Sequence, residues 1–334
     1  MTTAETKIHI TINTPPAPQV RVVFMGTPAF SAEILETLLQ AHYNIVGVVT
    51  KPDRPVGREQ TLETSPVKNI AVSHKLPILQ PERLDAAALK QLKEWKPDLI
   101  VVVAYGKLLP ETVLNLPGFG CVNIHTSLLP RWRGASPIQN ALLAGDTETG
   151  VSLMLLDKGM DTGPIIAQKS CPIDPMERSD TLTEKLTALS KELLLETLPL
   201  WVKRKITATP QPGEGVTLCQ LIEREDGRIF WDLTAPEIYN RYRGLYPWPG
   251  IFTFWKKDED DLVRIKLHEI ECQKVNPSTP RHVGEVFEIG EDLGVQTGSG
   301  VILIKSLQLE GKNKVSAAEF LRGNPKCVGS LLIS

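Results

Sequence analysis

The sequence predicts an α/β domain with a doubly wound parallel sheet, followed by a smaller β-barrel domain. Three observations lead to this fold class. The chain has 334 residues, which is enough for two domains. Apolar runs alternate with helical patterns up to residue 206, as in α/β proteins with a parallel sheet. Beyond residue 225, short β-like runs separated by turns replace that alternation.

The first elements follow this alternation closely. Arg21–Gly26 is an apolar run that ends at a glycine, and Pro28 then suits the first turn of a helix. Asp98–Tyr105 is almost continuously apolar, as expected for a central strand buried on both faces. The other elements expected here are strands at Asn44–Thr50 and Pro77–Gln80 and helices at Ser65–Lys75 and Asp85–Trp95.

The second part of the α/β domain continues with a strand at Cys121–His125 and a helix at Gly134–Ala144. Val151–Leu156 and Ile165–Cys171 are expected to form a hairpin. A long helix is expected at Thr181–Lys205, opened by a capping box of Thr181 with Glu184. In such a sheet, ligands bind at the carboxyl ends of the strands.

The domain boundaries follow changes in composition. Residues 1–20 are expected to be a flexible extension, and residues 21–206 the α/β domain. A Pro/Gly-rich stretch, Thr207–Gly215, opens a linker expected over residues 207–224. Residues 225–334 are expected to form the barrel from strands at Ile251–Trp255, Leu262–Leu267, Val283–Ile289, Gly294–Thr297 and Val301–Leu309.

Composition restricts the classes of partner and site. The net charge is −2, so a nucleic-acid site must be a local basic patch. The five cysteines and six histidines lack metal-site spacing, and we expect neither a metal nor a disulfide framework. The N-terminus lacks a signal-peptide pattern, and no stretch approaches the roughly 20 apolar residues of a membrane span. We expect a cytoplasmic monomer with no membrane contact.

The stretch CVNIHTSLLPRWRG, residues 121–134, carries the first candidate chemistry. Asn123 and His125 are two apart at a strand end and project to the same side. There they could donate hydrogen bonds to a developing oxyanion. Taken alone, this pair more often serves only a strand-to-loop turn. An apolar loop closed by proline, Ser127–Pro130, follows directly.

The stretch LLDKGMDTGP, residues 155–164, presents two carboxylates, Asp157 and Asp161, on a loop after a strand. A carboxylate near His125 would orient the imidazole, favour its charged form and help to move a proton. The alternative is a turn with solvated aspartates. The single Asp-Thr-Gly copy argues against an aspartic protease, which needs two facing carboxylates.

Together, these two stretches resemble the folate-dependent formyltransferase family in motif and in order. The resemblance implies a Rossmann-like catalytic domain, an OB-like second domain, 10-formyltetrahydrofolate as formyl donor, and no metal. It implies catalytic roles for Asn123, His125 and Asp161. The folate-contacting residues that it implies are Ser127, Leu128, Leu129, Pro130, Ala104, Tyr105, Gly106 and Asp157.

Further features resemble the branch of this family that formylates methionyl initiator tRNA, above all an inserted loop at residues 51–68. That branch implies translation initiation as the role. The loop is less basic than usual after Arg58, which puts contact there in doubt. The stretch Arg241–Trp248 alternates cationic with aromatic residues, which suits the binding of phosphates and unstacked bases. A solvated surface over buried aromatic side chains is an equally good interpretation. The tRNA contacts expected are Lys51, Arg54, Arg58, Arg241, Arg243, Lys312 and Lys314.

Other functions remain as alternatives. An amino-sugar nucleotide formyltransferase would use the same three catalytic residues without the inserted loop. A glycinamide ribonucleotide formyltransferase would normally stop near Lys205. A formyltetrahydrofolate hydrolase would use water in place of an amine. A dinucleotide-binding dehydrogenase is disfavoured because G-x-G-x-x-G is absent after the first strand. A non-catalytic tRNA-binding protein is disfavoured by the intact catalytic residues.

Overall fold

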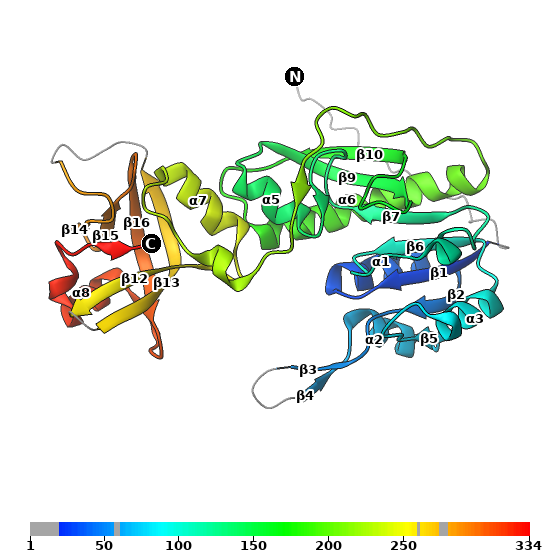
Figure 1. The fold of residues 1–334 in the computed structure, drawn as a ribbon, viewed down its shortest axis with the longest axis horizontal. Coiled ribbons are helices and arrows are strands. Elements are labelled where there is room, and N and C mark those ends of the chain that lie inside the picture. The colour runs from blue at the N-terminus through cyan, green and yellow to red at the C-terminus, as the bar shows by residue number, and fades with distance from the viewer. Residues whose placement is uncertain (1–19, 57–60, 259–260, 274–279) are drawn as a thin grey trace, which may run out of the picture. The chain divides into compact units, whose positions relative to one another are not determined.

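The computed structural model describes residues 20–56, 61–258, 261–273 and 280–334, and these pack into two compact units (Figure 1). The first unit holds residues up to 124, together with 155–158 and 191–208. The second holds 125–154, 159–190 and the chain from 209 onward. The expected N-terminal extension up to residue 19, and Arg58, lie outside the described residues.

The first unit contains five parallel strands in the order β7-β6-β1-β2-β5. The chain moves outward from β1, then returns to β6 on its other side, so the winding reverses between β1 and β6. The doubly wound topology that the sequence predicts is confirmed, and it places the ligand crevice at the carboxyl ends of these strands. The bounds are β1 Arg21–Gly26, β2 Asn44–Val49, β5 Ile78–Leu79, β6 Leu99–Val103 and β7 Cys121–His125.

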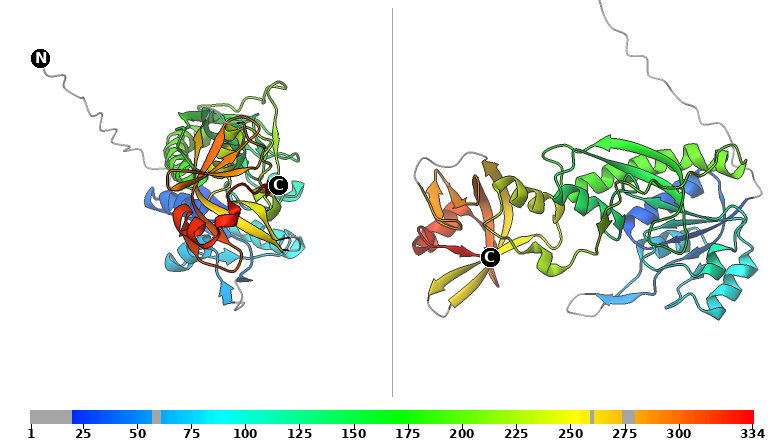
Figure 2. Two further views of the ribbon diagram at one scale, coloured as in Figure 1. Left: turned by 90° about the vertical axis from the view of Figure 1, so that its left-hand side faces the viewer. Right: turned by 45° about the horizontal axis from the view of Figure 1, so that its top comes forward.

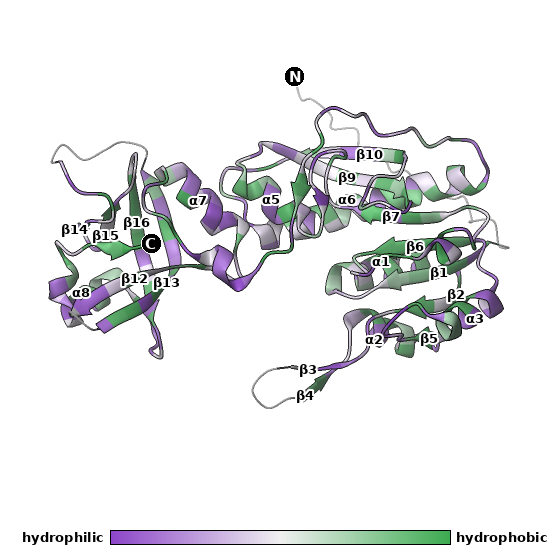
Figure 3. Cartoon of the chain, viewed as in Figure 1, coloured by the Kyte–Doolittle hydropathy of each residue, from purple (hydrophilic) through white to green (hydrophobic). Residues whose placement is uncertain are grey.

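The apolar runs become the centre of this sheet. Val22 to Met25 in β1 are 0% exposed, and every residue of β6 is buried. Figure 3 shows both strands as hydrophobic along most of their length. Between them the backbones approach closely, because a Cβ added to Gly26 would lie 2.8 Å from the carbonyl oxygen of Val103. The glycine that ends the first apolar run is therefore required by packing.

Helices connect these strands, as the periodicity predicts. Helix α2 is capped by Ser65, whose hydroxyl accepts a hydrogen bond from Lys68 N, and α3 is capped by Asp85 in the same way. Residues 51–68, expected as an inserted loop, contain a short hairpin of β3 and β4. The bounds are α1 Ala29–Gln40, α2 Pro66–Ser73, α3 Ala86–Trp95, α4 Glu111–Leu114, β3 Arg54–Val56 and β4 Thr61–Glu63.

The long helix α6 spans Ser179–Val202 and begins before the expected residue. Thr181 lies inside its first turn, and the Thr181 hydroxyl donates to the carbonyl oxygen of Arg178. The predicted capping box of Thr181 with Glu184 is therefore wrong. A pattern of residue types three apart did not locate the helix end, which ordinarily varies by one or two residues.

The second unit begins with an antiparallel hairpin of β9 (Glu148–Leu155) and β10 (Ile165–Pro172), as predicted. The helix expected from Gly134 starts later, as α5 (Pro137–Leu143). Arg133–Gly134 instead forms β8, which pairs in parallel with β11 (Leu218–Cys219) from the linker. Gly134 has a φ of 126°, which an α-helix does not allow.

A curled antiparallel sheet forms the rest of the second unit, in the order β14-β15-β16-β13-β12-β18 with β17 beside β16 (Figure 2). Val286 N donates to Ser330 O, and Leu332 N donates to Gly284 O, so backbone hydrogen bonds also join its two edges. The bounds are β12 Ile251–Asp258, β13 Asp261–Gln273, β14 Val286–Ile289, β15 Asp292–Gln296, β16 Val301–Leu309, β17 Lys314–Ser316 and β18 Leu332–Ile333.

Two helices of this unit were not predicted, α7 (Ala235–Gly244) and α8 (Ala317–Gly323). Two short 3₁₀ turns accompany them, η1 (Arg224–Gly227) and η2 (Pro325–Cys327). Helix α7 contacts α5, and a Cβ on Gly244 would lie 3.0 Å from the carbonyl oxygen of Gln139. No helix in the described part of the chain is long and apolar enough to cross a membrane.

Candidate active site

Strand β7 carries the first two candidate residues. All five of its residues are buried, with Asn123 8% and His125 5% exposed. Being two apart, the side chains leave the strand on the same face. Within the described residues, the Asn123 carboxamide makes no hydrogen bond to another residue, so its N–H groups are available to a ligand.

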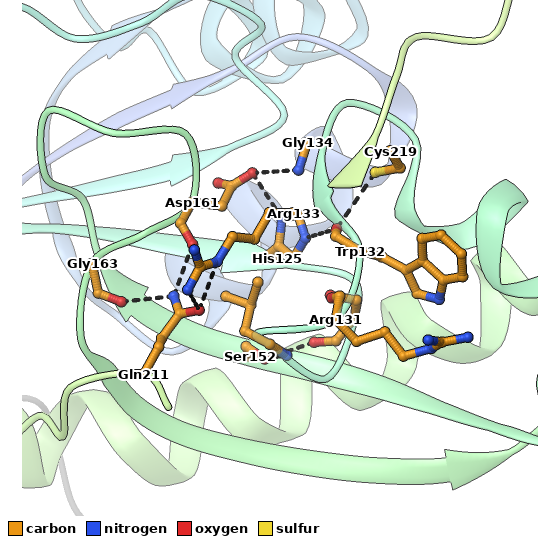
Figure 4. Close-up of polar contacts among 12 residues, drawn as sticks. His125, Arg131, Trp132, Arg133, Gly134, Ser152, Asp161, Gly163, Gln211 and Cys219 are labelled. Atoms are coloured by element: carbon orange, nitrogen blue, oxygen red, sulfur yellow. Dashed lines mark hydrogen bonds and ion pairs between the residues drawn. The ribbon is translucent and has the colours of Figure 1, made fainter. Parts of the chain in front are cut away.

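The backbone carbonyl of Trp132 orients the His125 ring. Nε2 of His125 lies 2.8 Å from that oxygen, which can only accept, so Nε2 carries a hydrogen. The Nδ1 edge then faces Asp161, whose Oδ2 lies 3.7 Å away (Figure 4). This distance is too long for a hydrogen bond, but it permits an ion pair when the ring is protonated. The expected pairing of His125 with Asp161 is present.

The position of Asp161 is fixed by the backbone conformation of its own loop and by a hydrogen bond from β8. Its φ is 53°, in the left-handed region that Asp tolerates better than most residues. Its Oδ2 accepts a hydrogen bond of 2.9 Å from Gly134 N. The carboxylate is only 15% exposed, so its interaction with a charged His125 is weakly screened.

The linker supplies contacts that the sequence did not reveal. Trp132 N donates to the Thr217 hydroxyl at 2.8 Å, and Cys219 Sγ lies 3.4 Å from Trp132 O. Burial raises the pKa of Cys219, so it remains a thiol that can donate to this carbonyl. Gln211 bonds Arg133 and the Asp161 loop (Figure 4). Backbone partners and a linker glutamine carry no motif that sequence reasoning could have used.

The expected folate loop, Ser127–Pro130, is held firmly by its own bonds. Ser127 is 0% exposed, and its hydroxyl donates to Arg131 O at 2.6 Å. Ser152 donates to Ser127 O and accepts from Leu129 N. The Ser127 side chain is buried in the loop, so its hydroxyl is not exposed to a ligand. Leu129 is also buried, which leaves Leu128 and Pro130 partly exposed.

The loop Ala104–Gly106 presents backbone rather than side chains. Ala104 and Gly106 are exposed with φ values of 45° and 74°. Tyr105 is 1% exposed within a hydrophobic cluster, and burial raises its pKa to about 12. The Tyr105 side chain is therefore packed inside the unit and is not exposed to a ligand. Lys51 lies against this loop, because a Cβ on Gly106 would be 2.6 Å from its Nζ. Asp157 is exposed.

The hairpin of β3 and β4 is anchored at its base. Lys68 forms an ion pair with Asp53, which also accepts a hydrogen bond from Gln80. These bonds hold the pKa of Asp53 below its ordinary value, with the Lys68 hydrogen bond as the largest cause. Arg54 is largely exposed and lies 3.8 Å from Glu82, which is also exposed. Such an exposed ion pair contributes little to stability.

The remaining basic residues expected to contact tRNA lie in the second unit, where two are exposed and two are bonded inside the protein. Lys312 and Lys314 are exposed, with no ion pair among the described residues. Arg243 is 5% exposed and donates to Asp174 O, Glu177 O and the Asn240 side chain. The expectation that Arg243 contacts tRNA is therefore corrected, because its guanidinium is used inside the protein. Arg241 is partly buried and likewise donates to a backbone carbonyl, that of Asp226.

Family comparisons match most of the chain. A model described as formyl transferase matches residues 20–198, and one for the formyl transferase C-terminal domain matches residues 221–325. The methionyl-tRNA formyltransferase of Desulforamulus reducens is 41% identical over 314 residues, covering 94% of this chain and 98% of that protein. The protein of the same name from Myxococcus xanthus is 42% identical, and the match covers 93% of this chain and 97% of that protein.

Solved structures share the fold at lower identity. An N-formyltransferase from Helicobacter canadensis, bound to folinic acid and dTDP-3-aminofucose, has a TM-score of 0.64 at 17% identity. It covers 89% of this chain and 100% of that chain. The methionyl-tRNA formyltransferase from Clostridium thermocellum has a TM-score of 0.52 at 17% identity, covering 75% and 93%.

Proposed function

The chain belongs to the formyl transferase family, and on that premise we propose that it formylates methionyl initiator tRNA from 10-formyltetrahydrofolate. The observation that carries the proposal is the pairing of His125 with Asp161 at 3.7 Å, at the carboxyl end of β7. Identity of 41% over nearly the whole of a methionyl-tRNA formyltransferase supports the choice of substrate. The product would serve in the initiation of translation.

The side chains suit an acyl transfer. The neutral α-amine of the methionyl group adds to the formyl carbon, forming a C–N bond and a tetrahedral oxyanion. Asn123 and protonated His125 donate hydrogen bonds to that oxyanion. Asp161 stabilises the charged imidazole and helps to move a proton from the amine to the leaving nitrogen. Breaking the C–N bond to folate then releases tetrahydrofolate.

Two loops whose shape is fixed are each proposed to contact the formyl donor. Residues Leu128 and Pro130 remain partly exposed, and Ala104 and Gly106 present backbone groups in left-handed conformation. A non-glycine residue such as Ala104 adopts that conformation at some cost, and such strain is found at ligand sites. The exposed carboxylate of Asp157 is proposed as a further contact for polar atoms of the pterin ring.

The tRNA would bind through several local groups. We assign residues 21–206 to catalysis, 207–224 to the linker and 225–334 to tRNA binding. Lys51 and Arg54 at the base of the hairpin are the candidates near the acceptor end. In the second domain, Lys312 and Lys314 are exposed cations suited to phosphate groups.

A hollow of about 240 Å³ in the second unit suits an unstacked nucleotide. Its lining includes Tyr242, Tyr246, Lys266 and His268. The guanidinium of Arg178 stacks on the Tyr246 ring at 3.8 Å, and Lys266 has no ion pair among the described residues. Tyr242 is buried, so the partly exposed Tyr246 ring and Lys266 are the groups proposed to hold a single-stranded base with its phosphate.

The test is formyl transfer from 10-formyltetrahydrofolate to methionyl initiator tRNA by the full chain, beside His125→Ala and Asp161→Asn. The wild type should transfer, and each variant should lose at least about 100-fold in kcat, because an oxyanion donor or a proton carrier is removed. A wild type that formylates only an amino-sugar nucleotide would overturn the choice of substrate. Variants that retain full activity would overturn the assigned residues.

A further inference from the structure

The linker side chain Gln211 joins two other segments of the second unit (Figure 4). Its Nε2 donates hydrogen bonds of 2.8 Å to the carbonyl oxygens of Asp161 and Gly163. Its Oε1 accepts from Nε and Nη2 of Arg133, at 3.0 and 2.7 Å. Both N–H groups of the carboxamide and both lone pairs of its oxygen are therefore used.

The segments joined by Gln211 are those that set the geometry of His125. On one side lies the loop of residues 159–163, which carries Asp161. Gln211 donates a hydrogen bond to the backbone carbonyl of Asp161, a residue in the left-handed backbone conformation. On the other side, Arg133 lies between Trp132, which orients His125, and Gly134, which orients Asp161. Fixing both sides with one planar group restricts the separation of His125 and Asp161.

We propose that Gln211 is a positioning residue for formyl transfer, so that the linker completes the active site as well as connecting the domains. This inference rests on the proposed function. Gln211 touches no reacting atom, and its effect passes through the Asp161 loop and residues 132–134. A shift of about 1 Å in such a constellation can cost 100-fold in rate.

Other contacts keep the linker in place without Gln211. Thr209 and Ile165 exchange two backbone hydrogen bonds of 2.8 Å, and β11 pairs with β8. The Thr217 and Cys219 contacts to Trp132 also remain. Removing the Gln211 carboxamide is therefore expected to loosen the Asp161 loop without unfolding the chain.

The experiment compares Gln211→Met and Gln211→Glu with Gln220→Met, an exposed glutamine of the same linker. Gln211→Met should lower kcat by about 10- to 100-fold, with the folate KM and the melting temperature nearly unchanged. Gln211→Glu should be equally impaired, because it retains the Arg133 contact but loses both donations to carbonyl oxygens. Gln220→Met should behave as wild type. Full activity in Gln211→Met would overturn the proposal.

Combining Gln211→Met with Asp161→Asn tests whether Gln211 acts by positioning Asp161 or by supporting the structure in general. If Gln211 acts through Asp161, Gln211→Met added to Asp161→Asn should lower kcat by less than about twofold further, since the two changes affect one interaction. A merely structural role would lower kcat by the same factor in both backgrounds. That additive result would contradict the inference.

Hydrogen exchange tests the same contact without relying on catalysis. In Gln211→Met, the amides of residues 159–163 and of Gly134 should exchange faster, while those of the β9–β10 hairpin remain protected. Unchanged exchange would overturn the inference even if activity fell. A wild type inactive on methionyl-tRNA would instead overturn the proposed function, and the exchange result would stand independently.

Discussion

At the scale of residues, backbone groups decide the geometry of the candidate site. His125 is oriented by the carbonyl of Trp132, and Asp161 by the amide of Gly134. Gly134 has a φ of 126°, and a Cβ there would lie 2.0 Å from the carbonyl oxygen of Cys219. A side chain at this position must therefore separate β8 from β11, and both orienting groups move with β8.

Gly134→Ala is expected to lower kcat by at least about tenfold, because it displaces the amide that holds Asp161. The measurement is steady-state formyl transfer under saturating folate and tRNA. Gly213→Ala, in the linker, is the matched control, since a Cβ there would meet nothing within 4 Å. Wild-type activity in Gly134→Ala would show that β8 and β11 can separate without moving Asp161.

At the scale of elements, helix α7 depends on its first turn. The Thr234 hydroxyl accepts from Glu237 N, and the Glu237 carboxylate accepts from Thr234 N and from its hydroxyl. These bonds lower the pKa of Glu237, with the Thr234 side chain as the first cause. Together they satisfy N–H groups that the helix start would otherwise leave unpaired.

Thr234→Ala is expected to lower the free energy of unfolding by about 1 kcal/mol, the usual cost of losing an N-cap. Denaturant unfolding monitored by circular dichroism measures this loss. Glu310→Ala serves as the control, because Glu310 is exposed and lies outside any helix.

The contribution of Glu237 should also depend on pH. Because its pKa is lowered in the folded chain, its stabilising effect is present above the unfolded value, about 4.3. That effect is lost as the pH falls through the folded pKa. Glu237→Gln should therefore be less stable than wild type at pH 7, and the difference should shrink as the pH falls below the unfolded value and vanish only below the lowered folded pKa. A difference that is constant with pH would argue against the capping box.

At the scale of the whole molecule, charge must act locally. The net charge is −2, and Arg243 is bonded inside the protein. A polyanionic substrate therefore meets no general positive field, and its binding must depend on a few exposed cations. Lys312 and Lys314 are the clearest examples in the second domain.

Rising salt is expected to lower kcat/KM for tRNA while leaving the folate KM nearly unchanged. Replacing both Lys312 and Lys314 by alanine should reduce the slope of log kcat/KM against log salt by about 1 for each lysine that pairs with a phosphate. Arg243→Met should instead lower the melting temperature, because it removes three internal hydrogen bonds of a buried guanidinium. An unchanged slope in the double lysine variant would remove these residues from the tRNA site.

Much of the fold was predictable because its signals are local. The strands predicted at Arg21–Gly26 and Cys121–His125 coincide with β1 and β7. The first is a largely apolar run, as expected for a strand buried on both faces. Helix α7 was missed although Thr234, Pro236 and Glu237 form a recognisable helix start. The β-like runs that follow this segment dominate the pattern of the region.

The sequence by itself determined the order of the main strands and helices of the α/β domain, the two-domain plan and the candidates Asn123, His125 and Asp161, because periodicity and motif spacing depend on near neighbours. Only the tertiary structure decided which groups orient them. Gln211 bonds residues 50 and 78 positions away, and Trp132 and Gly134 act through backbone atoms that every residue type possesses. The burial of Arg243 and Tyr105 was likewise decided by packing, since exposure depends on what the rest of the chain places around a side chain.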